Sequence, residues 1–246
     1  MRVGFSVPLG RLATGTKPAH SFAQSQQRST ATHHRLSKPT VDEPSKVLLR
    51  TKRTIDVLGA SFGLLILAPL LIGIAIAIKA TSTGPIFFRQ KRYGFHNRRF
   101  WIYKFRTMHI HLGDQKGTRQ TTTDDPRVTP LGRILRKSSL DELPQLINVL
   151  KGDMSLVGPR PHVPGMLAGG ILYEELTPYY FQRHHMRPGI TGLAQVSGYR
   201  GGTTVPLSAI ERLDRDLQYI ETWSLWLDAR ILVRTVIREF ISGSGD

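Results

Sequence analysis

The sequence predicts a membrane-associated domain of the α/β to α+β class, mostly helical, with one small β-hairpin and no established doubly wound sheet. Three observations predict it. A stretch of 22 residues, Val57–Ile78, carries no charge. Two short aromatic runs flank a turn signal at 94–97. Two later segments, 131–161 and 225–241, repeat apolar residues at helical spacing.

The composition is strongly basic. The chain has 34 Lys and Arg against 18 Asp and Glu, a net charge of +16. This excess favours polyanionic partners: nucleic acid, anionic lipid or phosphorylated substrates. The chain has no cysteine, which excludes disulfides, thiolate metal sites and cysteine nucleophiles. Any chemistry must therefore use oxygen or nitrogen groups.

The chain divides into three parts by composition. Residues 1–50 carry eight Lys and Arg and two acids, are rich in Ser, Thr and Gln, and predict a disordered basic tail. Such a tail is either a weak adhesive for membrane or nucleic acid, or a solvated segment with no specific role. A membrane helix is expected over 51–80, and a domain lying against the membrane over 81–246.

The apolar stretch before residue 79 is long enough to cross a bilayer, because 22 residues at 1.5 Å each reach about 33 Å. Pro69 near its middle kinks a helix. Basic residues flank both ends, with no acid from 79 to 106, so the positive-inside rule selects no orientation. We expect a re-entrant hairpin that bends at Pro69 and returns to the cytoplasmic side. A kinked spanning helix and a buried core helix are the alternatives.

A small β-hairpin is predicted next. The apolar runs at 86–88 and 100–103 are typical of short strands, and Gly94–Asn97 between them is typical of a turn.

The segment Leu131–Pro161 carries the chemistry. A helix with one buried face is predicted there, and Asp141 and Glu142 fall in its first turn. First-turn carboxylates also complement a helix dipole, and Ser139 with Glu142 fits a capping box, so a purely structural role is the alternative. The residues expected to form the buried face are Leu140, Leu143, Ile147 and Leu150.

Basic side chains surround this carboxylate pair in the sequence. Arg133, Arg136 and Lys137 precede it, and Gly158–Pro161 follows it with Arg160 between two prolines. An arginine fork grips phosphate oxygens in two places, while a carboxylate can hold a divalent ion or attack phosphorus. The combination points to phosphoryl chemistry. The Gly-rich loop 187–192 fits backbone binding of an anion in the same way.

Five collinear stretches carry a family resemblance over roughly three-quarters of the chain. They are KRTIDVLGA at 52–60, GPIFFRQKRYG at 84–94, YKFRTM at 103–108, DPRVTPLGRILRKSSLDELPQLINVLKGDMSLVGPRP at 125–161 and RPGITGLAQVSG at 187–198. In these residues the chain resembles the monotopic phosphoglycosyl transferases, also called bacterial sugar transferases or polyprenyl-phosphate hexose-1-phosphate transferases.

The resemblance implies an enzyme on the cytoplasmic face of the bacterial inner membrane. It implies transfer of a sugar-1-phosphate from a UDP-sugar to a polyprenyl phosphate such as undecaprenyl phosphate, with release of UMP. This reaction initiates a polysaccharide or glycoconjugate. Asp141 would attack the β-phosphate and form an aspartyl phosphosugar. Mg²⁺ would be held by Asp141 and Glu142, or Glu142 would instead assist as an acid or base. Direct transfer in a ternary complex, with Asp141 only holding the metal, is the alternative mechanism.

The expected partners follow from the same resemblance and from the charge. They are a UDP-sugar, a polyprenyl phosphate, anionic membrane lipids and, in a homo-oligomer, a second copy of the chain; nucleic acid is not expected. Each residue expected to bind phosphate has an ordinary structural ion pair as its alternative role. Those residues are Lys104, Arg106, Arg136, Arg160 and Arg187.

The chain departs from the family pattern at the helix break, where Ala68 precedes Pro69 in place of the usual serine. Proline must then bend the helix without a hydroxyl. Residues 1–50 contain no apolar run long enough for a further membrane helix, so we expect the chain to be similar to the minimal, exopolysaccharide-initiating members. The stretches 198–201 and 219–226 resemble glucose-1-phosphate transferring members, which favours UDP-glucose over UDP-galactose or an N-acetylated sugar.

The C-terminal segment 225–241 predicts a basic amphipathic helix, with Arg230, Arg234 and Arg238 on one side. Trp223 and Trp226 suit the membrane interface. An apolar face that only closes the soluble core is the alternative. For the whole chain, the competing function is a membrane-tethered basic protein that binds anions without catalysis.

Overall fold

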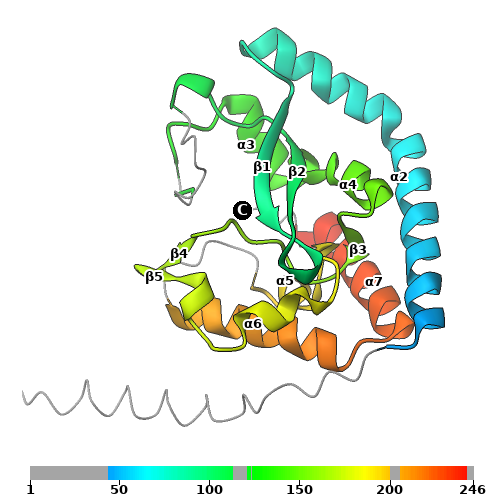
Figure 1. Cartoon of the computed structure of the whole chain (residues 1–246). Helices are drawn as coiled ribbons and strands as arrows, with labels where there is room; N and C mark the ends of the chain where they lie inside the picture. Colours follow the sequence, from blue (N-terminus) through cyan, green and yellow to red (C-terminus); the bar gives the residue numbers. More distant parts are fainter. Residues whose placement is uncertain (1–43, 113–120, 123, 200–205, 243–246) are drawn as a thin grey trace, which may run out of the picture. The chain divides into compact units, whose positions relative to one another are not determined.

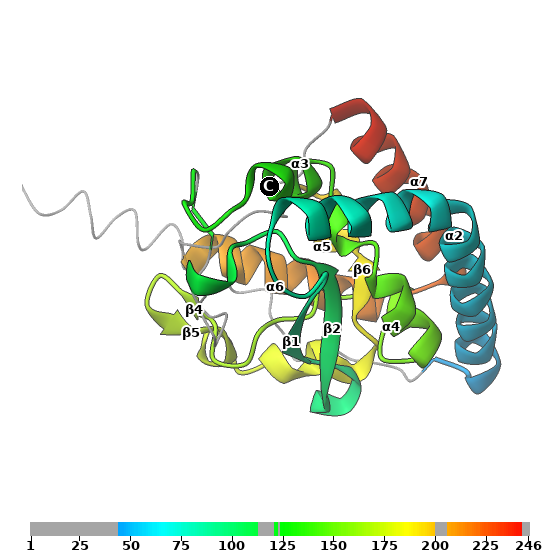
Figure 2. The ribbon, with the colours of Figure 1, turned by 90° about the horizontal axis from the view of Figure 1, so that it is seen from above.

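The computed structural model describes residues 44–112, 121–122, 124–199 and 206–242. More than half of them lie in helices (Figures 1 and 2). The predicted tail, 1–50, lies outside the described residues except for 44–50. The described elements are α2 Lys46–Thr81, β1 Phe87–Tyr93, η2 Phe95–Asn97, β2 Arg99–Phe105, η3 Ile110–Leu112, α3 Pro130–Lys137, η4 Leu140–Glu142, α4 Gln145–Lys151, β3 Ser155–Val157, β4 Leu167–Ala168, β5 Ile171–Leu172, η5 Tyr173–Glu175, η6 Tyr180–His185, β6 Gly189–Thr191, α5 Leu193–Val196, α6 Pro206–Glu221 and α7 Leu225–Ser242.

Helix α2 runs without interruption through Pro69. It begins at Lys46, earlier than the predicted residue 51, because the Ser45 hydroxyl accepts a hydrogen bond from the Leu48 N–H at 3.3 Å. Figures 1 and 2 show α2 as two arms that meet at a pronounced bend. A proline inside a helix lacks an N–H and crowds the carbonyl four residues earlier, which bends the helix. The element is thus one bent helix rather than two helices joined by a turn.

The two arms of α2 pack into different apolar clusters. Ala60 on the first arm packs with Ile102 and Val149. Ile74 on the second arm packs with Phe105. Both figures show α4 between the hairpin and the first arm. The bend therefore lets one helix follow two sides of the same domain.

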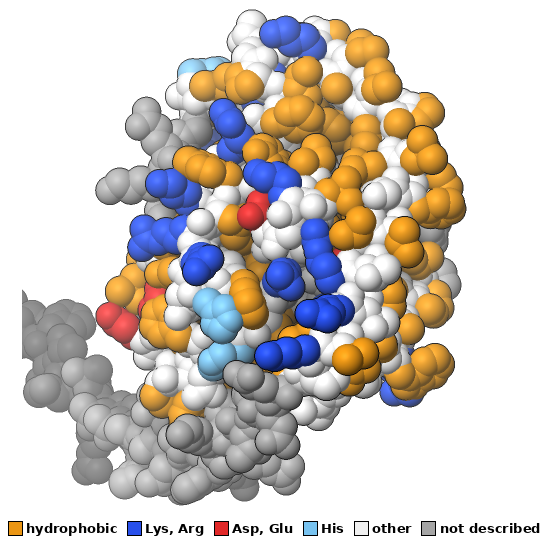
Figure 3. Space-filling view, turned by 45° about the vertical axis from the view of Figure 1, so that its right-hand side comes forward, with side chains coloured by type: hydrophobic (Ala, Val, Ile, Leu, Met, Phe, Trp, Pro, Cys, Tyr) orange, Lys and Arg blue, Asp and Glu red, His pale blue; other side chains and the backbone are white. Residues whose placement is uncertain are grey.

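Most apolar side chains of α2 point away from the protein. The helix is long and apolar enough to cross a membrane, and Figure 3 shows its apolar side chains following one side of the molecule. This exposure excludes the alternative of a buried core helix, because buried packing would cover such side chains. The apolar side chains of α2 that are between 58% and 76% exposed are Val47, Leu58, Phe62, Leu65, Ile66, Ile72 and Ile76.

A buried ion pair fixes the start of α2 to the C-terminal half of the chain. Lys52 Nζ donates to Asp228 Oδ2 at 2.6 Å and to the Val157 carbonyl at 3.0 Å. The hydroxyl of Tyr219 donates to Asp228 Oδ1 at 2.7 Å, and Trp223 Nε1 donates to Oδ2 at 3.2 Å. One carboxylate therefore joins α2, α6 and α7.

Further polar contacts hold the first arm against α4 and β3. Arg53 donates to the carbonyls of Val149 at 2.6 Å and Leu150 at 2.9 Å, which stabilises the C-terminal end of α4. Asp56 Oδ1 accepts from Ser155 Oγ and from the backbone N–H of Leu156, both at 2.9 Å.

The predicted hairpin is confirmed. Strands β1 and β2 pair antiparallel, with Phe87 opposite Phe105 and Tyr93 opposite Arg99. Because side chains alternate across a strand, Phe100 and Ile102 enter the core, and Lys104 shares their face.

The single helix predicted across 139–150 is wrong. Two elements replace it: after α3 ends at Lys137, η4 is a separate 3₁₀ turn, and α4 begins at Gln145. The break has a physical cause, since Ser139 adopts a left-handed backbone with φ 55° and Pro144 has no N–H to donate. The predicted buried face is displaced as well. Leu146 and Val149 are buried on α4, while Ile147 and Leu150 are exposed.

The described strands form three two-stranded sheets. β1 pairs with β2 and β4 with β5, both antiparallel, while β3 pairs with β6 in parallel. No doubly wound sheet is present in the described ranges, so the α+β form of the prediction holds.

Helix α7 is confirmed as a helix, with an apolar side that is only partly covered. Ile231 lies on the covered side of α7, is 1% exposed and packs in a buried apolar cluster. Val233, Val236 and Ile237 are 58%, 55% and 50% exposed. Closing the soluble core therefore does not account for the whole apolar side. Trp226 at its start is 70% exposed.

The Asp228 junction predicts a large stability effect. We expect Asp228→Ala to lower the free energy of unfolding by about 3–5 kcal/mol, because it leaves the buried Lys52 ammonium unpaired. Thermal unfolding in detergent measures it. Glu221→Ala, at an exposed residue that ends α6, is the control and should change stability little. Equal unfolding temperatures for both variants would contradict the role of the junction.

Candidate active site

The two candidate carboxylates lie on η4, between α3 and α4. Both are largely withdrawn from solvent, with Asp141 7% exposed. The capping box between Ser139 and Glu142 does not form, because the Ser139 side chain makes no capping hydrogen bond to this turn. The alternative of a purely helix-capping role is therefore not supported.

Glu142 is held by two cations from different elements. Lys104 Nζ of β2 donates to Oε1 at 2.7 Å. Arg160 donates to Oε1 at 2.7 Å and to Oε2 at 3.1 Å. Burial raises the pKa of Glu142, but Arg160 and Lys104 together outweigh burial and hold it well below its ordinary value. Glu142 is therefore an ionised, fixed carboxylate.

Asp141 has the opposite environment. It forms no salt bridge with the residues that the structure describes. Burial raises its pKa, and the Glu142 charge raises it further, although Lys104, Arg136 and Arg160 act in the other direction. The two adjacent carboxylates thus differ: Glu142 is ion-paired with two cations, whereas Asp141 has a raised pKa and no ion pair among the described residues.

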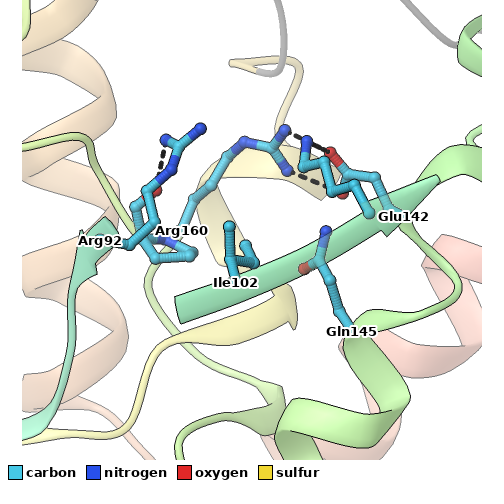
Figure 4. A pocket seen from close by; sticks show the side chains of 7 residues that line it. Arg92, Ile102, Glu142, Gln145 and Arg160 are labelled. Atoms are coloured by element: carbon cyan, nitrogen blue, oxygen red, sulfur yellow. Dashed lines mark hydrogen bonds and ion pairs between the residues drawn. The ribbon is translucent and has the colours of Figure 1, made fainter. Parts of the chain in front are cut away.

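A small pocket opens beside Glu142 (Figure 4). The ion pairs of Glu142 with Lys104 and Arg160 lie along it. Burial, followed by the neighbouring Arg160, lowers the pKa of Arg92 to about 10. The lining residues are Arg92, Ile102, Lys104, Glu142, Gln145, Arg160 and Pro161.

The loop that carries Arg160 is fixed by its backbone. Each of four consecutive carbonyls accepts a hydrogen bond from another segment, and the two prolines have no N–H that needs a partner. Arg160 therefore projects from a rigid base. The four bonds are Gly189 N to Pro159 O at 3.0 Å, Arg183 Nη2 to Arg160 O at 2.6 Å, Arg92 Nη1 to Pro161 O at 3.1 Å and Tyr93 N to His162 O at 3.1 Å.

Gly158 and Gly189 permit the close packing of this loop on β6. A Cβ on Gly189 would lie 2.1 Å from the Gly158 nitrogen, and one on Gly158 would lie 2.3 Å from the Arg187 carbonyl. Side chains at these positions are sterically excluded. The Gly189 amide donates to the Pro159 carbonyl at 3.0 Å, so within the loop 187–192 this amide is not free to bind an anion.

A buried ion pair supports the loop from below. Arg183 and Asp216 are each 1% exposed, and Arg183 Nη2 bonds both the Asp216 carboxylate and the Arg160 carbonyl. The pair links η6 and α6 to the base of Arg160.

The structure separates the five predicted phosphate-binding residues. Lys104 and Arg160 line the pocket. Arg136 lies close enough to Asp141 to lower its pKa, and its Nε donates to Thr107 Oγ1 at 2.9 Å.

Arg106 and Arg187 contact other groups of the chain. Arg106 Nη2 donates to the Ser82 carbonyl at 2.9 Å and to Ser82 Oγ at 2.8 Å, at the C-terminal end of α2. Arg187 Nε donates to the Gly152 carbonyl at 3.1 Å, and its guanidinium lies 5.3 Å from the Phe95 ring centroid. Neither lines the pocket.

Sequence reasoning missed Arg92 and Gln145. Arg92 shares a strand face with Gln90 and bonds its Oε1 at 2.6 Å. Gln145 follows Glu142 by three residues, so one turn of backbone brings both to the same side. The sequence signals that could have found them are the alternation of side chains along the strand for Arg92 and the three-residue spacing from Glu142 for Gln145.

Asp141 fits a divalent cation better than Glu142 does. Carboxylate oxygens suit Mg²⁺, which usually keeps water and substrate oxygens among its ligands. Asp141 has no cationic partner among the described residues, whereas both Glu142 oxygens already accept hydrogen bonds. No group of three or more His, Cys, Asp or Glu side chains suited to a metal occurs in the described ranges.

Comparisons with known proteins show which family the chain is similar to. The family model described as bacterial sugar transferase matches residues 47–242. The chain is 50% identical over 194 residues to the exopolysaccharide production protein PSS of Rhizobium leguminosarum bv. phaseoli, covering 79% of this chain and 97% of that protein.

Two further relatives carry longer chains. The undecaprenyl-phosphate glucose phosphotransferase of Komagataeibacter xylinus is 50% identical over 191 residues, 78% of this chain and 36% of that protein. The UDP-glucose:undecaprenyl-phosphate glucose-1-phosphate transferase of Caulobacter vibrioides is 50% identical over 185 residues, 75% of this chain and 68% of that protein. The chain thus spans about a third of one and two thirds of the other.

The unequal carboxylates predict a measurable pKa change. Glu142→Gln removes a negative charge beside Asp141 and leaves Lys104 and Arg160 unneutralised, so we expect the Asp141 pKa to fall. ¹³C NMR titration of aspartate-labelled protein in detergent measures it, with Asp141→Asn assigning the signal. A midpoint that stays constant or rises would contradict the coupling.

Proposed function

The chain belongs to the bacterial sugar transferase family, and we propose that it transfers a sugar-1-phosphate from a UDP-sugar to undecaprenyl phosphate, releasing UMP. The product would initiate an exopolysaccharide or a related glycoconjugate. Two of the similar proteins are named for glucose transfer to undecaprenyl phosphate, and one is named for exopolysaccharide production.

The observation that carries this proposal is the difference between Asp141 and Glu142. A nucleophile must be ionised, basic and free to approach phosphorus. Asp141 is buried, has a raised pKa and forms no ion pair with described residues. Glu142 is occupied by Lys104 and Arg160.

In the first half-reaction, an Asp141 carboxylate oxygen attacks the β-phosphorus of the UDP-sugar. The new O–P bond forms while the bond from that phosphorus to the bridging oxygen breaks. UMP leaves with the electron pair, and the sugar phosphate stays on Asp141 as an acyl phosphate. Arg136 and Arg160 act on Asp141 electrostatically, and they would stabilise negative charge that develops beside it.

In the second half-reaction, a phosphate oxygen of undecaprenyl phosphate attacks the same phosphorus. The Asp141–phosphorus bond breaks, the carboxylate is regenerated, and the lipid carries a diphosphate-linked sugar. Direct attack by the lipid on the UDP-sugar, with Asp141 only holding metal, is the competing route.

The charge of the site suits a diphosphate substrate. Four cationic side chains surround two carboxylates, which leaves two positive charges. A diphosphate can replace Glu142 as the acceptor for Lys104 or Arg160, since an arginine fork binds phosphate as it binds carboxylate. The four are Arg92, Lys104, Arg136 and Arg160.

We propose Mg²⁺ as cofactor, with Asp141 as its protein ligand. When bound, the ion would neutralise charge on the diphosphate. Glu142 joins as a ligand only if a substrate phosphate first displaces Lys104 or Arg160 from its oxygens.

Glucose is the sugar we propose. The names of two relatives at 50% identity specify glucose, in agreement with the resemblance of 198–201 and 219–226 to glucose-1-phosphate transferring members. Residues 200 and 201 lie outside the described ranges.

The bent helix α2 supports a site at the cytoplasmic face of the bacterial inner membrane. Its exposed apolar arms suit insertion into one leaflet, and the exposed apolar side of α7 with Trp226 suits the headgroup region. The basic surface would attract anionic lipid. A site at this level holds the lipid phosphate close to its target, which lowers the entropic cost of the encounter.

The reaction predicts UMP release from a panel of UDP-sugars by membranes that contain the protein, Mg²⁺ and undecaprenyl phosphate. We expect UDP-glucose to be the best substrate and Asp141→Asn to lose at least about 10³-fold in turnover, because the nucleophile is gone. No release with any sugar, from folded and membrane-bound protein, would favour the binding-protein alternative.

A single turnover without lipid separates the two routes. The covalent route predicts that the wild type releases up to one UMP per enzyme and retains the labelled phosphosugar on the protein. Asp141→Asn should do neither. UMP release that requires lipid from the first turnover would contradict the covalent route.

The re-entrant path predicts that both ends of α2 face the cytoplasm. Because the chain has no cysteine, Val47→Cys and Thr81→Cys each provide one reactive thiol at an exposed end. We expect an impermeant maleimide to label both in inverted vesicles and neither in intact spheroplasts. Labelling of one end from outside the cell would indicate a spanning helix.

A further inference from the structure

Helix α4 carries two buried amide side chains, three residues apart, with different hydrogen bonding. Asn148 is fully buried, and both its amide oxygen and its amide nitrogen form hydrogen bonds. Its Oδ1 accepts from the Tyr103 N–H at 3.0 Å, and its Nδ2 donates to the Trp101 carbonyl at 2.7 Å and to Asp153 Oδ2 at 3.4 Å. Asn148 therefore fastens β2 to α4 and has no spare donor for a ligand.

Gln145 is 2% exposed, yet its Nε2 donates to no group that the structure describes. The side chain lines the pocket beside Glu142. In Figure 4 its amide end points toward the side where Arg160 meets Glu142. A buried donor without an acceptor destabilises a folded protein. Its position on a pocket wall suggests that the acceptor arrives with a ligand.

The pocket restricts what that ligand can be. Its wall carries the cations Arg92, Lys104 and Arg160 and one carboxylate. Glu142 already accepts three hydrogen bonds from Lys104 and Arg160. The ligand must therefore supply its own acceptor oxygen, and an anionic one satisfies both the cations and the amide.

Building on the function proposed above, we propose that Gln145 Nε2 donates to a non-bridging oxygen of the phosphoryl group that Asp141 accepts. Gln145 is then a substrate-binding residue that orients this group. An amide is suited to the task because it adds a donor without adding to the repulsion among the surrounding cations. The group is common to every sugar nucleotide, so the contact is independent of the sugar.

The test compares Gln145→Met with Asn148→Leu. Methionine keeps the length of glutamine and removes the donor, so we expect an unchanged or higher unfolding temperature together with a 10- to 100-fold lower kcat/KM for UMP release. The loss should be the same for each accepted UDP-sugar. Asn148→Leu breaks three structural bonds and should lower the unfolding temperature.

Each outcome decides the proposal. Wild-type kcat/KM in Gln145→Met overturns it, and a loss that accompanies a lowered unfolding temperature assigns Gln145 a structural role. A loss that varies with the sugar assigns the donor to a sugar hydroxyl instead. If the wild type turns over no UDP-sugar, the proposed function fails, and affinity for inorganic phosphate then decides: weaker binding by Gln145→Met supports the contact, and equal binding overturns it.

Discussion

The ion pairs of Glu142 with Lys104 and Arg160 are the interaction on which the site depends. They join β2, η4 and the loop after β3 at one carboxylate. Because Glu142 takes up these two cations, Asp141 beside it remains without an ion pair among the described residues. The same contacts hold the pKa of Glu142 down, while burial and the Glu142 charge raise that of Asp141. Two adjacent carboxylates thus acquire separate roles.

The rigidity of this arrangement comes from backbone contacts beneath it. Arg160 stands on a loop whose consecutive carbonyls are bound by several segments, one of them through the buried Arg183–Asp216 pair. An arginine on such a base loses little conformational entropy when it binds a phosphate. Gln145 presents the opposite case, a buried donor left unbonded by the described protein groups. The hydrogen-bonded groups beneath Arg160 fix the site, and the unbonded donor of Gln145 indicates where a ligand would bind.

Helix α2 connects the site to an exposed apolar surface. Its buried side is fastened by Lys52, Asp56 and Arg53, which bind the same core elements that position η4 and α4. Its other side exposes large apolar side chains that water would disfavour. One helix therefore belongs both to the domain core and to the apolar phase that we propose it enters, and in that proposal it would set the height of the carboxylates relative to the lipid phosphates.

Sequence by itself determined the bent apolar helix, the β-hairpin and the amphipathic C-terminal helix, because periodicity, proline and charge act locally, and it singled out the pair Asp141 and Glu142 as the candidate site. Only the tertiary structure decided that η4 breaks the helix predicted across 139–150, since a left-handed Ser139 and Pro144 act against its apolar spacing. It alone placed Lys104 and Arg160 on Glu142, turned Arg106 and Arg187 to backbone carbonyls, and brought Arg92 and Gln145 to the pocket. These assignments depend on contacts between segments far apart in the chain, which residue type and spacing do not specify.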